Sequence, residues 1–231
     1  MTKTPFNIYG DANIPTTGAH GANITEQRVD RLDAECLDFV SSLTEQHAAR
    51  NIQAVDLGGG SGRQSMRMAA LGADVLLIDL SDQEPSAQQF NQEDARGKVR
   101  FLRKDMREIA DAEWPASIDC IYSQRAMNYL RYNAALDILS QLRRRASDHA
   151  RLFLSMGGLE TEYGRCYMAR DLPIEKRFGK LSPDMAAAHG IHADICLYRE
   201  SELVELVKAA GFTPITSWAS DFGSPKIIAK I

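Results

Sequence analysis

The chain has 231 residues, of which 44% are hydrophobic, and its composition shows no break that would divide it. This size allows one substantial core, so we expect a single domain spanning residues 1–231. The formal net charge of -4 argues against a general polyanion binder, because phosphate binding draws on clustered Lys and Arg side chains.

Four cysteines lie far apart without a Cys-x-x-Cys pair, and the first residues carry no apolar signal core. We therefore expect neither disulfides nor a metal site, and a cytoplasmic location. No apolar run approaches the roughly 20 residues that a membrane span needs, so no membrane partner is expected. The oligomeric state, monomer or homodimer, stays open.

Residues 1–24 are rich in Gly, Pro, Thr and Asn, which predicts an extended or mobile lead-in. A helix should begin after Thr25, a suitable N-cap, because apolar residues then recur at helical spacing as far as Leu43. Residues 1–50 thus form an N-terminal lid and helix. Tyr9 is a candidate to fold over a ligand, and a disordered terminus is the alternative.

From residue 52 short apolar runs alternate with amphipathic stretches, which is typical of an α/β fold with a largely parallel sheet. The strands predicted in this way are 52–57, 74–79, 99–103, 118–123 and 150–156. The predicted helices are 62–71, 84–93, 133–146 and 201–210. Ser201 is the expected N-cap of the last helix and Gly211 its stop. Two closing β-rich runs, 213–220 and 226–231, predict a hairpin that adds an antiparallel strand to the sheet.

A long connection, residues 157–199, separates the fifth strand from the last helix. Such a connection at the carboxyl edge of an open sheet is where a substrate cover would lie. It contains His189 and His192, which are candidate bases or substrate contacts; the alternative is an exposed or structurally satisfied imidazole. The rest divides into a cofactor-binding core, 51–156, and a closing helix and hairpin, 200–231.

A glycine-rich turn between the first two strands is the most informative motif. Glycines alternate at Gly58, Gly60 and Gly62 directly after a strand. They let the backbone approach a ligand, and the next helix presents free amide groups. The dinucleotide pattern Gly-x-Gly-x-x-Gly is incomplete, because Arg63 stands at its third glycine. An ordinary tight turn is the structural alternative.

Acidic residues end both strands that flank this turn. A carboxylate at Asp56 would repel a pyrophosphate, whereas it would attract, directly or through water, the ammonium of an amino-acid-bearing cofactor such as S-adenosylmethionine. The run Asp56-Leu-Gly-Gly-Gly-Ser-Gly62 resembles motif I of the class I S-adenosylmethionine-dependent methyltransferases. The resemblance implies a Rossmann-like, seven-stranded, mostly parallel sheet with helices on both faces, and S-adenosyl-L-methionine as cofactor.

The same resemblance assigns further residues to the cofactor. Asp79 matches the acid that binds both ribose hydroxyls, although it is also a candidate turn residue or helix cap. Asp105 matches the adenine-contacting acid, with Met106 beside the base, although Asp105 and Glu108 also form a capping-box pattern. The cofactor-binding residues implied are Asp56, Gly58, Gly60, Gly62, Asp79, Leu80, Asp105, Met106 and Ser123.

The acceptor is less well defined by the sequence. The resemblance implies methyl transfer to an O, N or S atom, with His189, His192 and Arg125 as candidate catalytic residues. Residues 123–126 replace the Asn/Asp-Pro-Pro-Tyr/Phe-like sequence of nucleic-acid amino-methyltransferases, which favours a small-molecule acceptor. RNA or protein methylation and a non-catalytic S-adenosylmethionine-binding subunit remain alternatives. An aminopropyltransferase is disfavoured because Arg125 would repel a polyamine.

Overall fold

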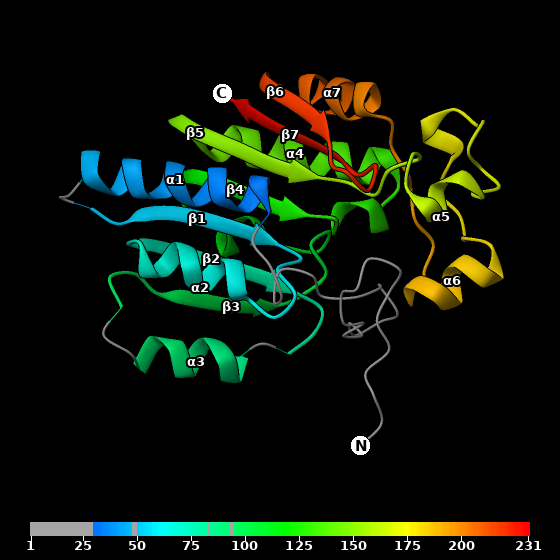
Figure 1. Cartoon of the computed structure of the whole chain (residues 1–231). Coiled ribbons are helices and arrows are strands. Elements are labelled where there is room, and N and C mark those ends of the chain that lie inside the picture. The colour runs from blue at the N-terminus through cyan, green and yellow to red at the C-terminus, as the bar shows by residue number, and fades with distance from the viewer. Residues whose placement is uncertain (1–29, 48–49, 83, 93–94) are drawn as a thin grey trace.

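The computed structural model describes residues 30–47, 50–82, 84–92 and 95–231, so the predicted lid around Tyr9 and the predicted cap Thr25 lie outside the described part (Figure 1). The strands are β1 (Ile52–Leu57), β2 (Ala73–Asp79), β3 (Val99–Arg103), β4 (Ile118–Gln124), β5 (Ala146–Ser155), β6 (Thr213–Ala219) and β7 (Pro225–Lys230). The α-helices are α1 (Arg31–Gln46), α2 (Arg63–Ala70), α3 (Glu84–Gln92), α4 (Tyr132–Arg145), α5 (Glu162–Arg165), α6 (Pro183–His189) and α7 (Glu200–Ala209).

Seven strands of the described chain form one sheet in the order β3-β2-β1-β4-β5-β7-β6. Strands β1 to β5 pair in parallel, and β7 is antiparallel to both β5 and β6. This confirms the predicted mostly parallel sheet with an antiparallel C-terminal hairpin. Strand β5 begins at Ala146, four residues before its predicted start.

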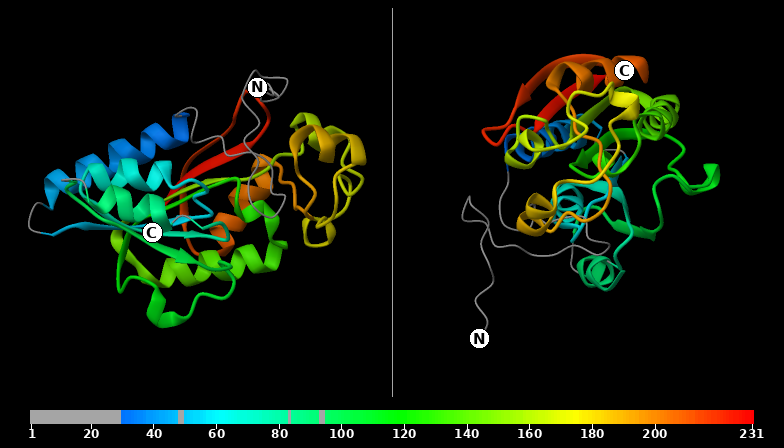
Figure 2. Two further views of the ribbon diagram at one scale, coloured as in Figure 1. Left: turned by 90° about the horizontal axis from the view of Figure 1, so that it is seen from below. Right: turned by 90° about the vertical axis from the view of Figure 1, so that its right-hand side faces the viewer.

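Helices cover both faces of the sheet, as Figure 2 shows. One buried cluster joins α1 and α2 to Ala54 of β1, and a second joins α4 and α7 to the next residue, Val55. Successive strand residues point to opposite faces, so β1 is apolar on both sides. Helices cover both faces of the sheet, so a ligand can reach the strands at the edge where the parallel strands end.

Two helix starts differ in detail from the pattern of the sequence. Helix α1 has Asp30 as its N-cap, whose carboxylate accepts hydrogen bonds from the amides of Leu32 and Asp33. The predicted N-cap of the last helix, Ser201, is wrong: α7 begins at Glu200 after the N-cap Arg199. The reason is that the Glu202 carboxylate accepts the Arg199 amide at 2.7 Å.

Residues 157–199 form a subdomain with a small core of its own, which includes Leu159, Tyr167 and Ile195. Its helices α5 and α6 lie beyond the carboxyl ends of β4 and β5 (Figure 1). An isolated parallel bridge between Gly158 and Tyr198 closes the base of the subdomain. The predicted cover therefore stands at the edge where parallel strands end. Among the described residues, no helix is long and apolar enough to cross a membrane.

One buried ion pair ties this subdomain to α7. The Arg177 guanidinium is 1% exposed and donates to both carboxylate oxygens of Glu202, at 2.6 and 2.8 Å. It also donates to the carbonyl oxygens of Leu172 and Leu197. A buried guanidinium left without its carboxylate has a high desolvation cost, so this pair fixes the position of the cover.

We expect Glu202→Ala to lower the free energy of unfolding by about 3 kcal/mol, because Arg177 would stay buried without a counter-charge. Urea titration followed by circular dichroism measures this loss. Glu205→Ala on the same helix is the control. Among the described residues Glu205 forms an ion pair with the exposed Lys208 alone, so its removal should cost about 0.5 kcal/mol or less. Equal losses in the two variants would contradict the proposed role of the pair.

Candidate functional site

The turn between β1 and α2 can be built only with glycine. Gly58, Gly60 and Gly62 have φ angles of +67°, +57° and +75°, which other residues rarely adopt. A Cβ on Gly58 would lie 2.2 Å from the Cβ of Ala126, and one on Gly62 would lie 2.9 Å from a methyl group of Leu77. The backbone therefore bends closely around the carboxyl ends of β1 and β4.

Asp79 at the end of β2 holds this turn. Its Oδ2 accepts the Gly60 amide at 2.9 Å, and its Oδ1 accepts the amide and hydroxyl of Ser81 at 2.8 and 2.5 Å. The hydrogen bonds to Ser81 show that Asp79 is a turn residue, which is the alternative predicted from the sequence. The bond to Gly60 also joins the two strand ends, where a ligand over the turn would meet the carboxylate.

Asp56 at the end of β1 is fully buried beneath the turn. Its Oδ2 accepts the Ser65 hydroxyl at 2.6 Å, whereas its buried Oδ1 has no hydrogen-bond partner within the described residues. Burial raises the pKa of Asp56 to about 7; the Ser65 hydrogen bond opposes this shift, and the charges of Asp79 and Asp33 add to it. An unpartnered buried carboxylate oxygen fits a cationic ligand group nearby.

The end of β3 adjoins the glycine turn. Asp105 accepts the amide of Arg107 at 2.9 Å and its guanidinium at 2.9 and 2.5 Å. These bonds form a local turn, and the described chain begins no helix at Asp105, so the capping-box interpretation does not hold. The Met106 methyl group lies 3.5 Å from the position that a Cβ on Gly58 would take. Met106 is therefore beside the glycine turn.

Two other predicted cofactor residues have different surroundings. Ser123 is fully buried, and its hydroxyl donates to the Leu57 carbonyl oxygen at 2.9 Å, which joins β4 to β1. Leu80 follows β2 with 44% of its surface exposed. The Ser123 side chain thus has a structural partner, while Leu80 offers apolar surface at the ligand edge.

Arg125 follows β4 with a φ of +51°, and it is the one non-glycine residue with positive φ in the described ranges. Its amide donates to the Ser155 carbonyl oxygen at 2.9 Å, so the strained backbone is held by the neighbouring strand. Strained torsions in folded proteins cluster at functional sites. The predicted catalytic candidate therefore sits directly beside Ala126 and the glycine turn.

The structure separates the two predicted histidines. His189 ends α6, is 13% exposed, and places its Nε2 3.2 Å from a Glu162 carboxylate oxygen. Its ring meets that of Tyr163 edge-on with centroids 5.0 Å apart. The His192 side chain is exposed, and its carbonyl oxygen accepts the Lys180 ammonium. Only His189 belongs to a side-chain cluster of the cover.

Asn128 in a short 3-10 turn, Met127–Tyr129, connects the cover to the end of β4. Its side-chain oxygen accepts the Gly157 amide at 3.3 Å, and its carbonyl oxygen accepts the Cys196 amide at 2.7 Å. The sequence places Asn128 just after the fourth strand, but it does not reveal these two hydrogen-bond partners.

A buried charge cluster beside Arg125 was missed by sequence reasoning. Asp30 Oδ2 accepts the Lys226 ammonium and the Gln124 amide, each at 2.6 Å. The Lys226 side chain is 5% exposed; burial lowers its pKa, and the charge of Asp30 opposes that shift. Asp30 and Lys226 are 196 positions apart, so no local signal reveals the pair.

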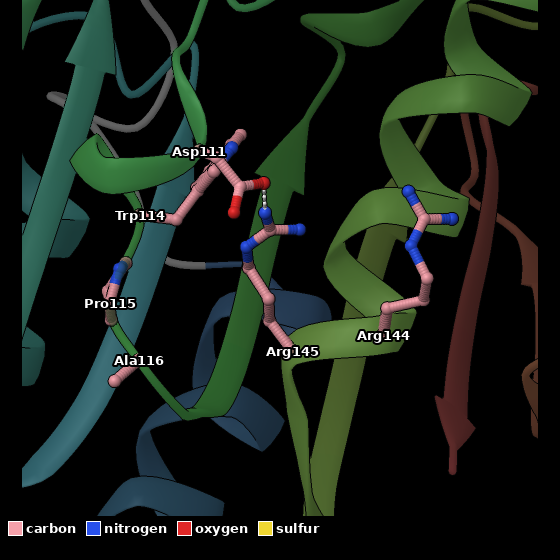
Figure 3. A pocket seen from close by; sticks show the side chains of 6 residues that line it. All are labelled: Asp111, Trp114, Pro115, Ala116, Arg144 and Arg145. Carbon is pink, nitrogen blue, oxygen red and sulfur yellow. Dashed lines mark ion pairs between the residues drawn. The ribbon is translucent and has the colours of Figure 1, made fainter.

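A hollow of about 440 Å³ lies at the opposite end of β4, before its first residue (Figure 3). Asp111, Trp114 and Arg145 are among its lining residues, and Asp111 forms an ion pair with Arg145. Arg144 and Arg145 end α4, where cations complement the helix dipole. This hollow is separate from the glycine turn.

The residues that fit a nucleoside carrying an amino-acid group are all at the carboxyl edge of the sheet. Comparison with known proteins gives the class. Residues 54–148 match the family model described as a methyltransferase domain. No curated protein sequence matches the chain.

Solved structures share the fold. 1,6-Didemethyltoxoflavin-N1-methyltransferase of Burkholderia thailandensis, solved with 1,6-didemethyltoxoflavin and S-adenosylhomocysteine, has a TM-score of 0.57 at 20% identity, covering 84% of this chain and 77% of that chain. An S-adenosylmethionine-dependent methyltransferase of Clostridium acetobutylicum gives 0.61 at 10% identity, covering 90% and 94%. Magnesium protoporphyrin IX methyltransferase of Synechocystis PCC 6803 with bound S-adenosylhomocysteine gives 0.57 at 16%, covering 96% and 90%.

The family model describes residues 54–148 as a methyltransferase domain. The three solved structures are named as methyltransferases and two of them hold S-adenosylhomocysteine, so the chain has the fold of S-adenosylmethionine-dependent methyltransferases. The glycine turn, the unpartnered oxygen of Asp56 and the carboxylate of Asp79 lie at one edge of the sheet, where they could hold a ligand that carries an amino group and hydroxyls.

The raised pKa of Asp56 predicts that the free energy of unfolding depends on pH. Its pKa of 3.8 in the unfolded chain rises to about 7 on folding, so between these values only the folded state keeps the proton. We expect stability relative to Asp56→Asn to fall by up to about 1.4 kcal/mol per pH unit from pH 4 to pH 7, and then to level off. Urea titrations of both proteins across this range measure the difference. A difference independent of pH would refute the burial argument.

Proposed function

We propose that the protein transfers a methyl group from S-adenosylmethionine to a small-molecule acceptor. The observation that carries the proposal is the glycine turn locked by the bond from the Gly60 amide to Asp79, at the open edge of the sheet. Such a turn brings bare backbone against a ligand where a helix N-terminus and a carboxylate converge. The cover, residues 157–199, stands at the same edge.

Each carboxylate of the site receives a distinct role in this proposal. Asp56 balances the cofactor's ammonium, directly or through water, since its Oδ1 is buried without a partner among the described residues. Asp79 accepts the ribose hydroxyls, which would compete with the Ser81 hydroxyl for the same carboxylate. Asp105 and Met106 contact the adenine, with Arg107 fixing the Asp105 rotamer.

The cofactor supplies a methyl group on a sulfonium, and its leaving group is a neutral thioether that needs no protonation. The protein must therefore align the acceptor and exclude water. The cover performs the second task, docked through Asn128. An acceptor hydroxyl of high pKa would also need a base, for which His189, held by Glu162, is better placed than the exposed His192.

The small-molecule assignment is supported by the absence of a nucleic-acid motif after β4 and by the acidic charge balance. The toxoflavin-precursor and magnesium protoporphyrin enzymes that share the fold are named for small acceptors. The acceptor atom, O, N or S, is left to experiment.

Two measurements test the proposal. Calorimetry with S-adenosylhomocysteine should show one site per chain. Incubation with labelled S-adenosylmethionine and a metabolite mixture should then release S-adenosylhomocysteine in amounts exceeding the enzyme. Binding without any turnover would instead favour the non-catalytic subunit, and labelling of added RNA or protein alone would exclude a small acceptor.

The ribose role of Asp79 gives a sharper prediction. We expect Asp79→Ala to weaken S-adenosylhomocysteine binding by about 2–3 kcal/mol, roughly 30- to 150-fold in Kd, through the loss of a charge-assisted double hydrogen bond. The control is Asp74→Ala in the same strand, because Asp74 bonds Asn51 at the opposite edge of the sheet. Calorimetry compares the two variants, and an unchanged affinity in Asp79→Ala would exclude the ribose contact.

A further inference from the structure

Arg125 carries a charge that the described structure leaves without a counter-ion. The residue is half-buried, and within the described ranges its guanidinium makes no ion pair or hydrogen bond. Its backbone is held at a φ of +51°, a torsion that costs an arginine energy and a glycine almost none. An unpartnered cation on a strained backbone is costly unless a ligand uses it.

The neighbouring ionisable groups do not neutralise this charge. Lys226 lies close enough for Arg125 to lower its pKa further, and Lys226 is itself satisfied by Asp30. Both carboxylate oxygens of Asp33 accept hydrogen bonds elsewhere, one from the Tyr122 hydroxyl and one from the Asp30 amide. None of these groups pairs with the positive charge of Arg125.

Aromatic side chains flank the same position. Burial raises the pKa of the Tyr129 phenol, and the guanidinium of Arg125 is close enough to oppose this shift. The Tyr163 hydroxyl lies 3.4 Å from the position that a Cβ on Gly157 would take, where the cover meets β5. His189 adds its ring against Tyr163. The surroundings of Arg125 thus combine one positive charge with aromatic surface.

Arg125 is linked to the glycine turn through the next residue in the chain. Ala126, the next residue, occupies the space that a side chain on Gly58 would need. The backbone of Arg125 is consequently one residue away from direct contact with the turn. A ligand group bound by the guanidinium would lie on the side of the turn that faces the cover.

We infer that Arg125 anchors the acceptor and that the acceptor is a planar small molecule bearing an anionic group, a carboxylate or an acidic hydroxyl. This inference rests on the proposed function and names its substrate class. The guanidinium binds the anionic group by a charge-assisted, two-pronged hydrogen bond, and the tyrosines contact the ring. Arg125 selects the acceptor in this scheme and transfers no proton.

The test uses benzoate and benzamide, two ring compounds of similar shape that differ in charge. Their Kd values for the full chain saturated with S-adenosylhomocysteine are measured by ligand-observed NMR. We expect benzoate to bind about tenfold more tightly than benzamide to the natural protein, and the two to bind equally to Arg125→Gln. Arg144→Gln removes the same charge from an exposed position near the other end of the sheet and should keep the preference.

A second variant guards against misfolding. Arg125→Gly suits the positive φ, so it should unfold at the same or a higher urea concentration while losing the preference for benzoate. Equal affinity of the two probes for the natural protein, binding of neither, or a preference that survives in both Arg125 variants would overturn the inference. Each of these results leaves the cofactor assignment intact as long as S-adenosylhomocysteine binds. Failure of S-adenosylhomocysteine to bind the natural protein would overturn the proposed function, and this inference with it.

Discussion

The absence of a side chain at position 58 is the constraint on which the whole site depends. A Cβ there would stand 2.2 Å from Ala126, so only glycine lets the turn after β1 touch the loop after β4. These two strands are neighbours in the sheet order, and parallel strands bring their carboxyl ends to one edge. The close approach joins one half of the edge, made by β1, β2 and β3, to the other half, made by β4 and the cover.

Most of the fold follows from the sequence because its signals are local. The β1 and β3 bounds agree with the predicted ranges, since short runs rich in apolar residues end at polar turns on both sides. The misses occur where a tertiary contact decides. β5 extends back to Ala146, which pairs with Ile118 of β4 ahead of a register shift. The Glu202 carboxylate accepts the Arg199 amide at the start of α7 and is also engaged by the distant Arg177. The pairing of Ala146 with another strand and that of Glu202 with Arg177 do not follow from the local sequence.

The candidate site divides in the same way. Gly58, Gly60 and Gly62 are recognisable in the sequence because a positive φ favours glycine, so the residue type indicates the backbone conformation. The direction in which a hydroxyl or a carboxylate points cannot be predicted in this way. The Ser123 hydroxyl, for example, donates to the Leu57 carbonyl oxygen on another strand. The pairing of Lys226 with Asp30 needs the closing hairpin and the first helix to meet at one edge, which depends on the complete sheet order.

Electrostatics give the two halves of this edge opposite character. Carboxylates lie at the ends of β1 and β2, and an arginine follows β4. Lys226 of β7 forms an ion pair with Asp30. A sulfonium donor brings a positive charge between these halves, and transfer of its methyl group to an anionic atom removes one positive charge from the donor and one negative charge from the acceptor. In a site closed to water, opposite charges on donor and acceptor attract strongly, and their loss on reaction weakens the hold on the products. The same charge separation that orients the two ligands would therefore assist their release, provided that the Arg125 guanidinium keeps a separate anionic group of the acceptor and leaves the reacting atom free.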